Sequence, residues 1–278
     1  MLAELHCHSI YSTGSTIKAE GFNTLKEIMA HAKKLGIGIL ALTDHDTIRG
    51  HRDAKKYAKK YGIIFIPGEE VTSEKGHILA LGIQERIKPG LSVIETIEKI
   101  HDQGGIAIAA HPYDFRRKGI GDSAKYCDAI EVFNAINVDR TANLRANKLA
   151  ELYHKPKTAG SDAHWLPMMG HGLTEIRCTN VDGCLKEIKN GRTKLRTKYL
   201  EMSILTEWAI RRLKYSYYYL LNYMDINYRW PKRVIAKRLI KLVNHSPGHI
   251  DYIFRGLAYL FLGGIMTYSI FRNIILRR

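Results

Sequence analysis

The chain has 278 residues, 45% of them hydrophobic, which is enough for a packed core and excludes a disordered or low-complexity protein. Its four cysteines include no Cys-x-x-Cys pair, so the sequence predicts neither a zinc knuckle nor a disulfide framework, but reduced, mostly buried thiols in a cytoplasmic protein. The net charge of +16 is unevenly distributed along the chain. Residues 195–278 carry 15 Lys and Arg against 4 Asp and Glu, which gives a net charge of +11. Residues 1–194 carry a net charge of only +5. We therefore expect a domain over 1–194 and a basic, aromatic helical tail over 195–278.

Short apolar runs alternate with amphipathic stretches along the first part. The runs predict seven strands, at 2–7, 37–43, 62–67, 77–82, 105–110, 128–133 and 156–161. The amphipathic stretches predict helices at 22–35, 51–61, 92–103 and 140–153. Continuous apolar strands separated by helices are typical of a parallel α/β sheet that is buried on both faces. So many strands in so short a chain favour a barrel over a doubly wound sheet.

Histidines and carboxylates follow most of these strands. His6 and His8 share one face of the first strand, and Cys7 points the other way, into the core. Later strands are followed by Asp44, His45 and Asp46, by Glu69 and Glu70, by His111, by Asn134, and by Asp162 and His164, whereas His77 begins its strand. Strand ends of a parallel sheet converge on one face, where ligands bind. Bringing these groups together would cost free energy through repulsion and desolvation unless divalent cations offset it. Mixed imidazole and carboxylate ligands suit Zn²⁺, Mn²⁺ or Fe²⁺.

The motifs "LHCHS", "ALTDHDT", "PGEEVTS…GHILALG", "AHP" and "AGSDAH", in this order over about residues 1–180, closely resemble the PHP (polymerase and histidinol phosphatase) family of phosphoesterases. The resemblance implies a distorted seven-stranded barrel with two or three divalent metal ions, in a stand-alone protein acting on nucleoside phosphates or short nucleic acids. It implies that His6, His8, Glu70 and Asp162 hold one metal, that Glu70 bridges to a second held by His77 and His111, and that His45 and His164 hold a third. The role of Glu69 stays open.

The chain departs from the family pattern at Thr13. Members commonly place an Asp or His there to complete the third metal's ligands, and threonine is a poor ligand. We expect that metal to be weakly bound or absent unless Asp44, Asp46 or His51 compensates.

The resemblance implies hydrolysis of a phosphate ester by attack of a metal-bridging hydroxide, with His164 or His45 as proton donor. Arg116 and Arg117 are candidates for gripping a second phosphate, and a solvated basic turn is an equal alternative. The expected substrate is a nucleotide or short nucleic acid. Two alternatives are a phosphatase of a small metabolite such as histidinol phosphate, and a catalytically weak metal-binding regulatory module. A nucleophilic Cys7 is disfavoured, since it has no base partner.

The tail supports three interpretations. Residues 233–243 form an amphipathic helix with Arg233, Lys237, Arg238 and Lys241 on one side, and residues 256–271 carry no charge. The tail could pack on the barrel, bind single-stranded nucleic acid, or contact a membrane. The uncharged run is shorter than the ~20 residues of a spanning helix. We expect peripheral contact of residues 233–278 with anionic lipid, which would place the protein at the inner face of the membrane.

Overall fold

The computed structural model describes residues 1–14, 17–114 and 118–275. Within them nine strands form one sheet: β1 Leu2–Glu4, β2 Ile37–Leu42, β3 Ile64–Thr72, β4 His77–Leu81, β5 Ile106–Ala109, β6 Ala129–Asn134, β7 Lys157–Gly160, β8 Gly172–Ile176 and β9 Thr193–Thr197. The α-helices of these residues are α1 Leu25–Lys34, α2 His51–Tyr61, α3 Val93–His101, α4 Arg140–Leu152, α5 Val181–Lys189, α6 Met202–Tyr215, α7 Tyr217–Asn227, α8 Lys232–Leu242 and α9 Ile250–Ile275. Short 3-10 helices lie at Gly121–Tyr126, Leu166–Met168 and Val243–His245.

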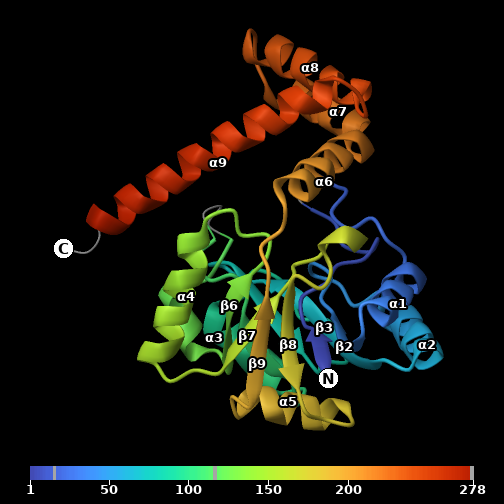
Figure 1. The fold of residues 1–278 in the computed structure, drawn as a ribbon, viewed down its shortest axis with the longest axis vertical. Coiled ribbons are helices and arrows are strands. Elements are labelled where there is room, and N and C mark those ends of the chain that lie inside the picture. Colours follow the sequence, from blue (N-terminus) through green and yellow to red (C-terminus); the bar gives the residue numbers. More distant parts are fainter. Residues whose placement is uncertain (15–16, 115–117, 276–278) are drawn as a thin grey trace.

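The sheet has the strand order β7-β6-β5-β4-β3-β2-β1-β8-β9 and curls into a nearly closed barrel (Figure 1). Its two ends meet through side chains: the Thr174 hydroxyl of β8 accepts a hydrogen bond from the Ala159 amide of β7 at 3.0 Å, and the Thr193 hydroxyl of β9 donates to the Lys157 carbonyl at 2.9 Å. Helices α1 to α5 lie outside the sheet (Figure 1). The predicted α/β barrel is confirmed, with nine strands instead of seven.

The sheet is mixed, which corrects the expectation of a parallel one. β4 runs antiparallel to β3 and β5, and β8 is antiparallel to β1 and β9. Only residues 73–76 join β3 to β4, and a parallel crossover needs a dozen residues or more, so β4 must return antiparallel. The sequence analysis missed β8 and β9. The residues of β9, "TKLRT", are half-buried or exposed, so this strand lacks the apolar run by which the others were found.

The four predicted helices of the first part form where expected, and local capping explains their starts. α1 and α3 each begin with a capping box, Thr24 with Glu27 and Ser92 with Glu95, in which each side chain pairs with the other's backbone amide. α2 ends at Gly62, whose φ of +67° is a left-handed conformation that glycine adopts freely. These helices pack apolar faces on the barrel and leave the strand ends open.

The C-terminal helices α6 to α9 lie over one end of the barrel (Figure 1). Ile210, Leu220, Ile240 and Val243 form a small apolar cluster among them, and Ile17 of the barrel domain packs against it. β9 crosses the predicted boundary at residue 194, so the sheet extends to Thr197. The division into two domains stays a prediction.

The cysteines differ in part from expectation. Cys178 and Cys184 are joined by a disulfide, with their Cα atoms 5.2 Å apart. Helix α5 begins between them, because the Asn180 side chain accepts a hydrogen bond from the Gly183 amide, and its first turn brings Cys184 back beside Cys178. The prediction of four reduced thiols is therefore wrong for this pair. Cys7 and Cys127 are free and buried.

Candidate metal centre

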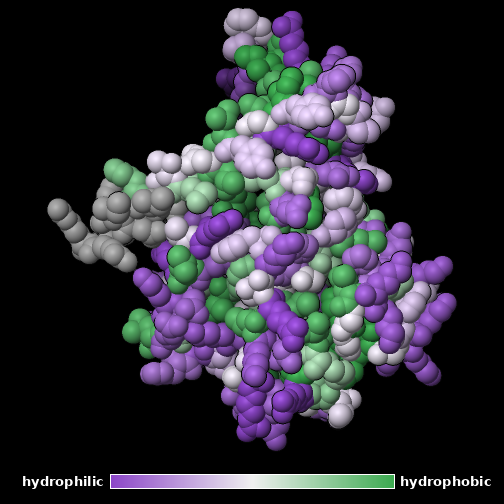
Figure 2. Space-filling model, viewed as in Figure 1, coloured by the Kyte–Doolittle hydropathy of each residue, from purple (hydrophilic) through white to green (hydrophobic). Residues whose placement is uncertain are grey.

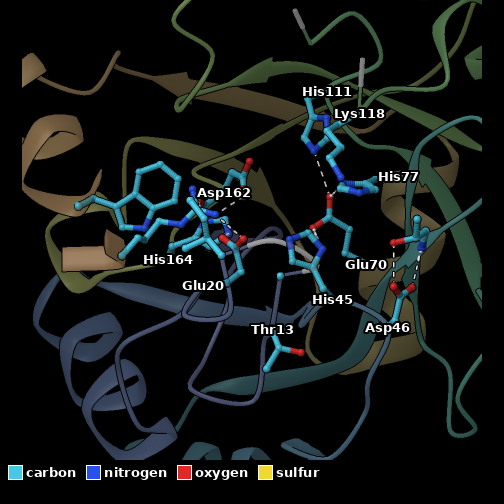
Figure 3. A pocket seen from close by; sticks show the side chains of 15 residues that line it. Thr13, Glu20, His45, Asp46, Glu70, His77, His111, Lys118, Asp162 and His164 are labelled. Carbon is cyan, nitrogen blue, oxygen red and sulfur yellow. Dashed lines mark hydrogen bonds and ion pairs between the residues drawn. The ribbon is translucent and has the colours of Figure 1, made fainter. Parts of the chain in front are cut away.

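Most of the predicted metal ligands line one pocket of about 550 Å³ at the rim of the barrel (Figure 3), and His6 and His8 lie buried beside Glu70. His6 and His8 follow β1, His45 follows β2, Glu70 lies in β3, His111 follows β5, and Asp162 and His164 follow β7. His77 reaches the same rim from the start of its strand, because β4 is antiparallel to its neighbours. The reversed strand thus explains why His77 alone precedes its strand.

Glu70 lies at the centre of this cluster, and its two carboxylate oxygens face different imidazoles. Oε1 is 2.7 Å from His77 Nδ1 and 3.0 Å from His111 Nε2. Oε2 is 3.0 Å from His45 Nδ1, 3.3 Å from His8 Nε2 and 3.4 Å from His6 Nε2. A carboxylate shared in this way has the arrangement of a ligand that bridges two cations.

Asp162 closes the other side of the His6–His8 pair. Its Oδ1 atom lies 3.5 Å from His6 Nε2 and 3.3 Å from His8 Nε2. The Cys7 side chain lies in the hydrophobic core beside these two histidines, as strand alternation predicts. His6, His8, Glu70 and Asp162 are therefore brought together as the resemblance implies.

Several buried polar atoms of this cluster lie near one another but form no hydrogen bond of normal geometry among the described residues. They include His6 Nε2, His8 Nε2 and Glu70 Oε2. Orphaned buried donors and acceptors are rare in folded proteins, and an ion is one of the standard explanations. His, Asp and Glu atoms also fall into groups of three within 4.8 Å of one another, such as His6, His8 and Glu70. This donor set fits a borderline divalent cation.

Strong electrostatic coupling accompanies this burial. Burial alone would raise the pKa of Glu70, but the imidazoles of His45 and His77 outweigh it and hold the pKa well below its ordinary value. Burial lowers the pKa of His8 to about 4. For His6 the carboxylates of Asp162 and Glu131 outweigh burial and raise the pKa. Glu70 is therefore ionised and His8 is neutral near pH 7, the forms in which a carboxylate and an imidazole bind metals.

A second layer of hydrogen bonds orients these side chains. Glu131 Oε1 lies 3.0 Å from His6 Nδ1, and its Oε2 accepts from the His111 amide and from the Asn134 side chain. Ser12 Oγ lies 3.1 Å from His8 Nδ1. A partner on the far nitrogen fixes ring orientation and leaves Nε2 directed at the cluster. His111 and Asp162 hold positive φ angles of 28° and 52°, strained conformations that cluster at functional sites.

Other predicted residues do not face the metal ligands, although Asp46 lines the same pocket. Glu69 turns away from the cluster and accepts a hydrogen bond from the Ile87 amide. The Asp44 carboxylate accepts hydrogen bonds from Ser9, and the Asp46 carboxylate accepts hydrogen bonds from Thr72. His51 Nε2 lies 2.8 Å from the Gly68 carbonyl oxygen. Arg116 and Arg117 lie outside the described residues.

The pocket also contains residues that the sequence analysis did not single out. Glu20 lies beside His164 and Asp162, and Lys118 beside His111 (Figure 3). Trp208 and Arg212 come from α6 and line the same pocket. No short motif marks Glu20 or the two α6 residues, because they come close to the cluster only through the packing of the C-terminal helices. Lys118 follows Arg116 and Arg117, the two candidates for gripping a second phosphate.

Three relatives have similar sequences. An uncharacterized protein of Methanocaldococcus jannaschii is 43% identical over 149 residues, 51% of this chain and 87% of that protein. A phosphoribosyl 1,2-cyclic phosphate 1,2-diphosphodiesterase of Eggerthella lenta is 33% identical, and a 5'-3' exoribonuclease of Haemophilus influenzae is 29% identical, each over 109 residues. The matches cover 36% and 38% of this chain, and 38% and 37% of those two enzymes.

The overall fold and a family model that matches the C-terminal part of the barrel both indicate one protein family. A two-domain protein of Bacteroides vulgatus containing a predicted PHP-like metal-dependent phosphoesterase has the same fold, with a TM-score of 0.59 and 17% identity, over 71% of this chain and 64% of that one. A family model described as PHP-associated matches residues 140–193. Together with the extent of the Methanocaldococcus match, these findings identify the chain as a member of the PHP family of phosphoesterases.

Proposed function

We propose that this protein is a metal-dependent phosphoester hydrolase acting on a nucleotide or short nucleic acid. The observation that carries the proposal is Glu70, whose two oxygens lie between two sets of imidazoles in a buried cluster. Such a centre suits phosphoester chemistry, because a negatively charged phosphoryl group must be neutralised before it is attacked.

The proposed ligands are those implied by the family resemblance. His6, His8, Glu70 and Asp162 would hold one cation, Glu70 with His77 and His111 a second, and His45 with His164 a third. When bound, Mn²⁺, Zn²⁺ or Fe²⁺ would supply positive charge to phosphoryl oxygens and make water acidic enough to attack near neutral pH. An imidazole nitrogen that ligates a cation cannot also carry a proton. The cation content at His45 and His164 therefore decides between their roles as ligands and as proton donors.

The substrate class is supported by the pocket and by the relatives. Lys118 and Arg212 bring positive charge to the wall of the pocket, and Trp208 brings an aromatic ring. Cations and aromatic rings are the groups that bind phosphates and stack on bases. The names of two relatives, a cyclic phosphate diphosphodiesterase and an exoribonuclease, agree with a phosphodiester or nucleotide substrate.

Two alternatives keep the same site. A phosphatase of a small metabolite such as histidinol phosphate needs the same cations but not Trp208. A regulatory module would bind metal without turnover. The test offers the purified full-length protein nucleoside monophosphates and bisphosphates, short oligonucleotides and histidinol phosphate with Mn²⁺, Zn²⁺ or Mg²⁺. Metal-dependent release of phosphate from nucleotides supports the proposal, and tight metal binding without any turnover supports the regulatory module.

The tail suits contact with an anionic membrane surface, and we propose this in addition. Ile235 and Leu239 of α8, and Leu257 and Leu260 of α9, are exposed. Figure 2 shows hydrophobic side chains beside hydrophilic ones on the surface of the C-terminal helices. Among the described helices, α9 alone is long and apolar enough to cross a membrane, and 6% of its apolar window, Ile250–Tyr268, is buried. A cytoplasmic protein at the inner face of the membrane remains part of this proposal.

A further inference from the structure

We propose that Glu20 supplies the carboxylate that Thr13 does not, and that Arg212 of α6 positions it, so that the C-terminal helices form part of the metal centre. The proposal rests on the proposed function, because it concerns the third cation position, at His45 and His164. It assigns that position a ligand that the sequence motifs do not contain.

The first observation is the position of the Glu20 carboxylate. Glu20 is 8% exposed, and its Oε2 atom lies 3.7 Å from His164 Nε2. Ring nitrogens of His8, His45 and His164 lie within 4.8 Å of one another beside it. His45 and His164 therefore share the pocket with the Glu20 carboxylate (Figure 3), a mixed nitrogen and oxygen set that borderline divalent cations prefer.

The second observation is that the other candidates are engaged elsewhere. Asp44 accepts hydrogen bonds from the amide and hydroxyl of Ser9 at 2.6 and 2.7 Å. Asp46 accepts two from Thr72, at 2.7 and 2.8 Å. His51 is directed at the Gly68 carbonyl. Glu20 faces His164 and is not among the proposed ligands of the other two cations, which include Glu70 and Asp162.

The third observation is that one face of α6 holds Glu20 in place. Residues 208, 212 and 216 are spaced by four, so they share a helix face. Arg212 forms an ion pair with Glu20 Oε1, and its Nε donates to the Ala19 carbonyl at 3.4 Å. The Ser216 hydroxyl accepts a hydrogen bond from the Ala19 amide at 3.1 Å. Both the side chain of Glu20 and the backbone before it are thus fixed by α6.

Trp208 connects the same face to the histidines. Its ring centroid lies 5.2 Å from that of His164, and the Arg212 guanidinium lies 4.6 Å from the Trp208 ring centroid. Arg212 binds Oε1, and Oε2 is the oxygen that lies 3.7 Å from His164 Nε2. Arg212 is therefore a positioning residue in this proposal, comparable to the outer partners that orient metal ligands, whose loss typically weakens metal binding 10–100-fold.

The test measures Mn²⁺ binding by the full-length protein, through elemental analysis after dialysis against graded Mn²⁺ and through titration calorimetry. We expect three cations per chain in the wild type. Glu20→Gln should lose the weakest-bound cation, or bind it at least about 10-fold more weakly, with the other two unchanged. Arg212→Met should weaken the same cation, and Arg212→Lys should restore part of its affinity. Thr13→Asp added to Glu20→Gln should restore the third cation.

The matched controls are Glu207→Gln and Arg211→Met, which break an exposed Glu–Arg ion pair within the same helix. Both should bind three cations. The two cations retained by Glu20→Gln show that the variant is folded. If the Glu20→Gln variant binds cations as the wild type does, the assignment of Glu20 is wrong. It is also wrong if a wild type that hydrolyses phosphoesters binds only two cations. Neither result contradicts the proposed function. A wild type that binds no cation and hydrolyses nothing overturns the proposed function as well.

Discussion

Glu70 connects the two sets of imidazoles, and its replacement should damage the centre more than any other single change. Glu70→Gln keeps the shape of the side chain but removes the charge that both cation positions share. We expect loss of at least one bound cation and a fall in turnover of more than about 100-fold, since even outer partners of metal ligands cost 10–100-fold. Elemental analysis and a phosphate-release assay measure both effects.

Glu69→Gln is the natural control for this change. Glu69 is the adjacent residue in β3, is equally buried, and binds the Ile87 amide instead of facing the cluster. The Glu69→Gln variant should keep its bound cations. If Glu70→Gln also keeps its cations and its turnover, the bridging role assigned to Glu70 is wrong.

Asp128 allows a test of pH dependence away from the metal centre. Burial alone would raise the pKa of Asp128, but hydrogen bonds from the Ala107 amide and from His101 outweigh it and hold the pKa below its ordinary value of 3.8. A carboxyl group with a lowered pKa stabilises the fold above pH 3.8, and this contribution is lost as the pH falls through the folded-state value.

Asp128→Asn should therefore lower the free energy of unfolding at pH 7 by about 1–3 kcal/mol, the usual cost of weakening a hydrogen bond to a charged group. The difference from wild type should shrink below about pH 4. Urea denaturation at pH 7, 5, 4 and 3 measures it. Asp102→Asn, at an exposed carboxylate paired with Lys99, should change the stability by less than about 0.5 kcal/mol at every pH. A difference that stays constant down to pH 3 contradicts the assignment.

At the level of residues, the sequence indicated which side chains would lie near one another, because they lie in or next to apolar strands. His6, His111 and Asp162 could be placed at a common rim from the strand pattern alone. Glu20 and Arg212 could not, since neither adjoins a strand and they meet only after α6 packs against the loop before α1. Contacts between residues 192 positions apart leave no local periodicity to read.

At the level of elements, apolar runs located β2 and the helices α1 to α4 closely, because buried strands and amphipathic helices have distinct periods. They did not give the direction of β4 or the existence of β9. Whether a strand runs parallel or antiparallel to its neighbour depends on the length of the loop that joins them. Edge strands with polar side chains lack the apolar run that predicts a strand. The predicted amphipathic helix at 233–243 corresponds to α8, although its apolar Ile235 and Leu239 are exposed.

A buried hydroxyl of β8 hydrogen-bonds to β7 at the junction of these two strands, and this contact can be tested by substitution. Thr174 is fully buried, accepts a hydrogen bond from the Ala159 amide at 3.0 Å and donates to the Ala159 carbonyl at 3.1 Å. Thr174→Val keeps the volume but leaves that amide unpaired, so it should lower the free energy of unfolding by about 1–3 kcal/mol. Thr174→Ser keeps the hydroxyl and should cost about 1 kcal/mol for the lost methyl group. Equal stabilities of the Val variant and wild type in urea denaturation would show that the hydroxyl does not close the barrel.

At the scale of the whole molecule, the C-terminal helices have two sides with different roles. One face of α6 reaches the metal centre, whereas α8 and α9 expose apolar side chains to solvent. An exposed apolar surface of this kind marks an interaction site. The basic charge of residues 195–278 favours an anionic lipid surface as its partner.

The geometry of α9 favours lying in the membrane surface over crossing it. The helix is about 39 Å long at ~1.5 Å per residue, but Asp251 and Arg255 lie in its first turns. Its uncharged part, residues 256–271, is about 24 Å long, shorter than the ~30 Å hydrocarbon core. A helix that lies at the interface buries its apolar side chains and leaves its charges at the headgroups.

We therefore expect the full-length protein to float with vesicles that contain anionic phosphatidylglycerol, and not with neutral phosphatidylcholine vesicles. Salt should weaken the binding, since each Lys or Arg near the surface contributes roughly 1 kcal/mol. Leu257→Ser with Leu260→Ser should reduce flotation. The matched control, Leu144→Ser with Leu152→Ser, changes two exposed leucines of α4 on the barrel and should have no effect. Binding to single-stranded RNA in place of vesicles would assign the tail to nucleic acid. Release from cell membranes only by detergent, never by salt, would show that α9 crosses the bilayer.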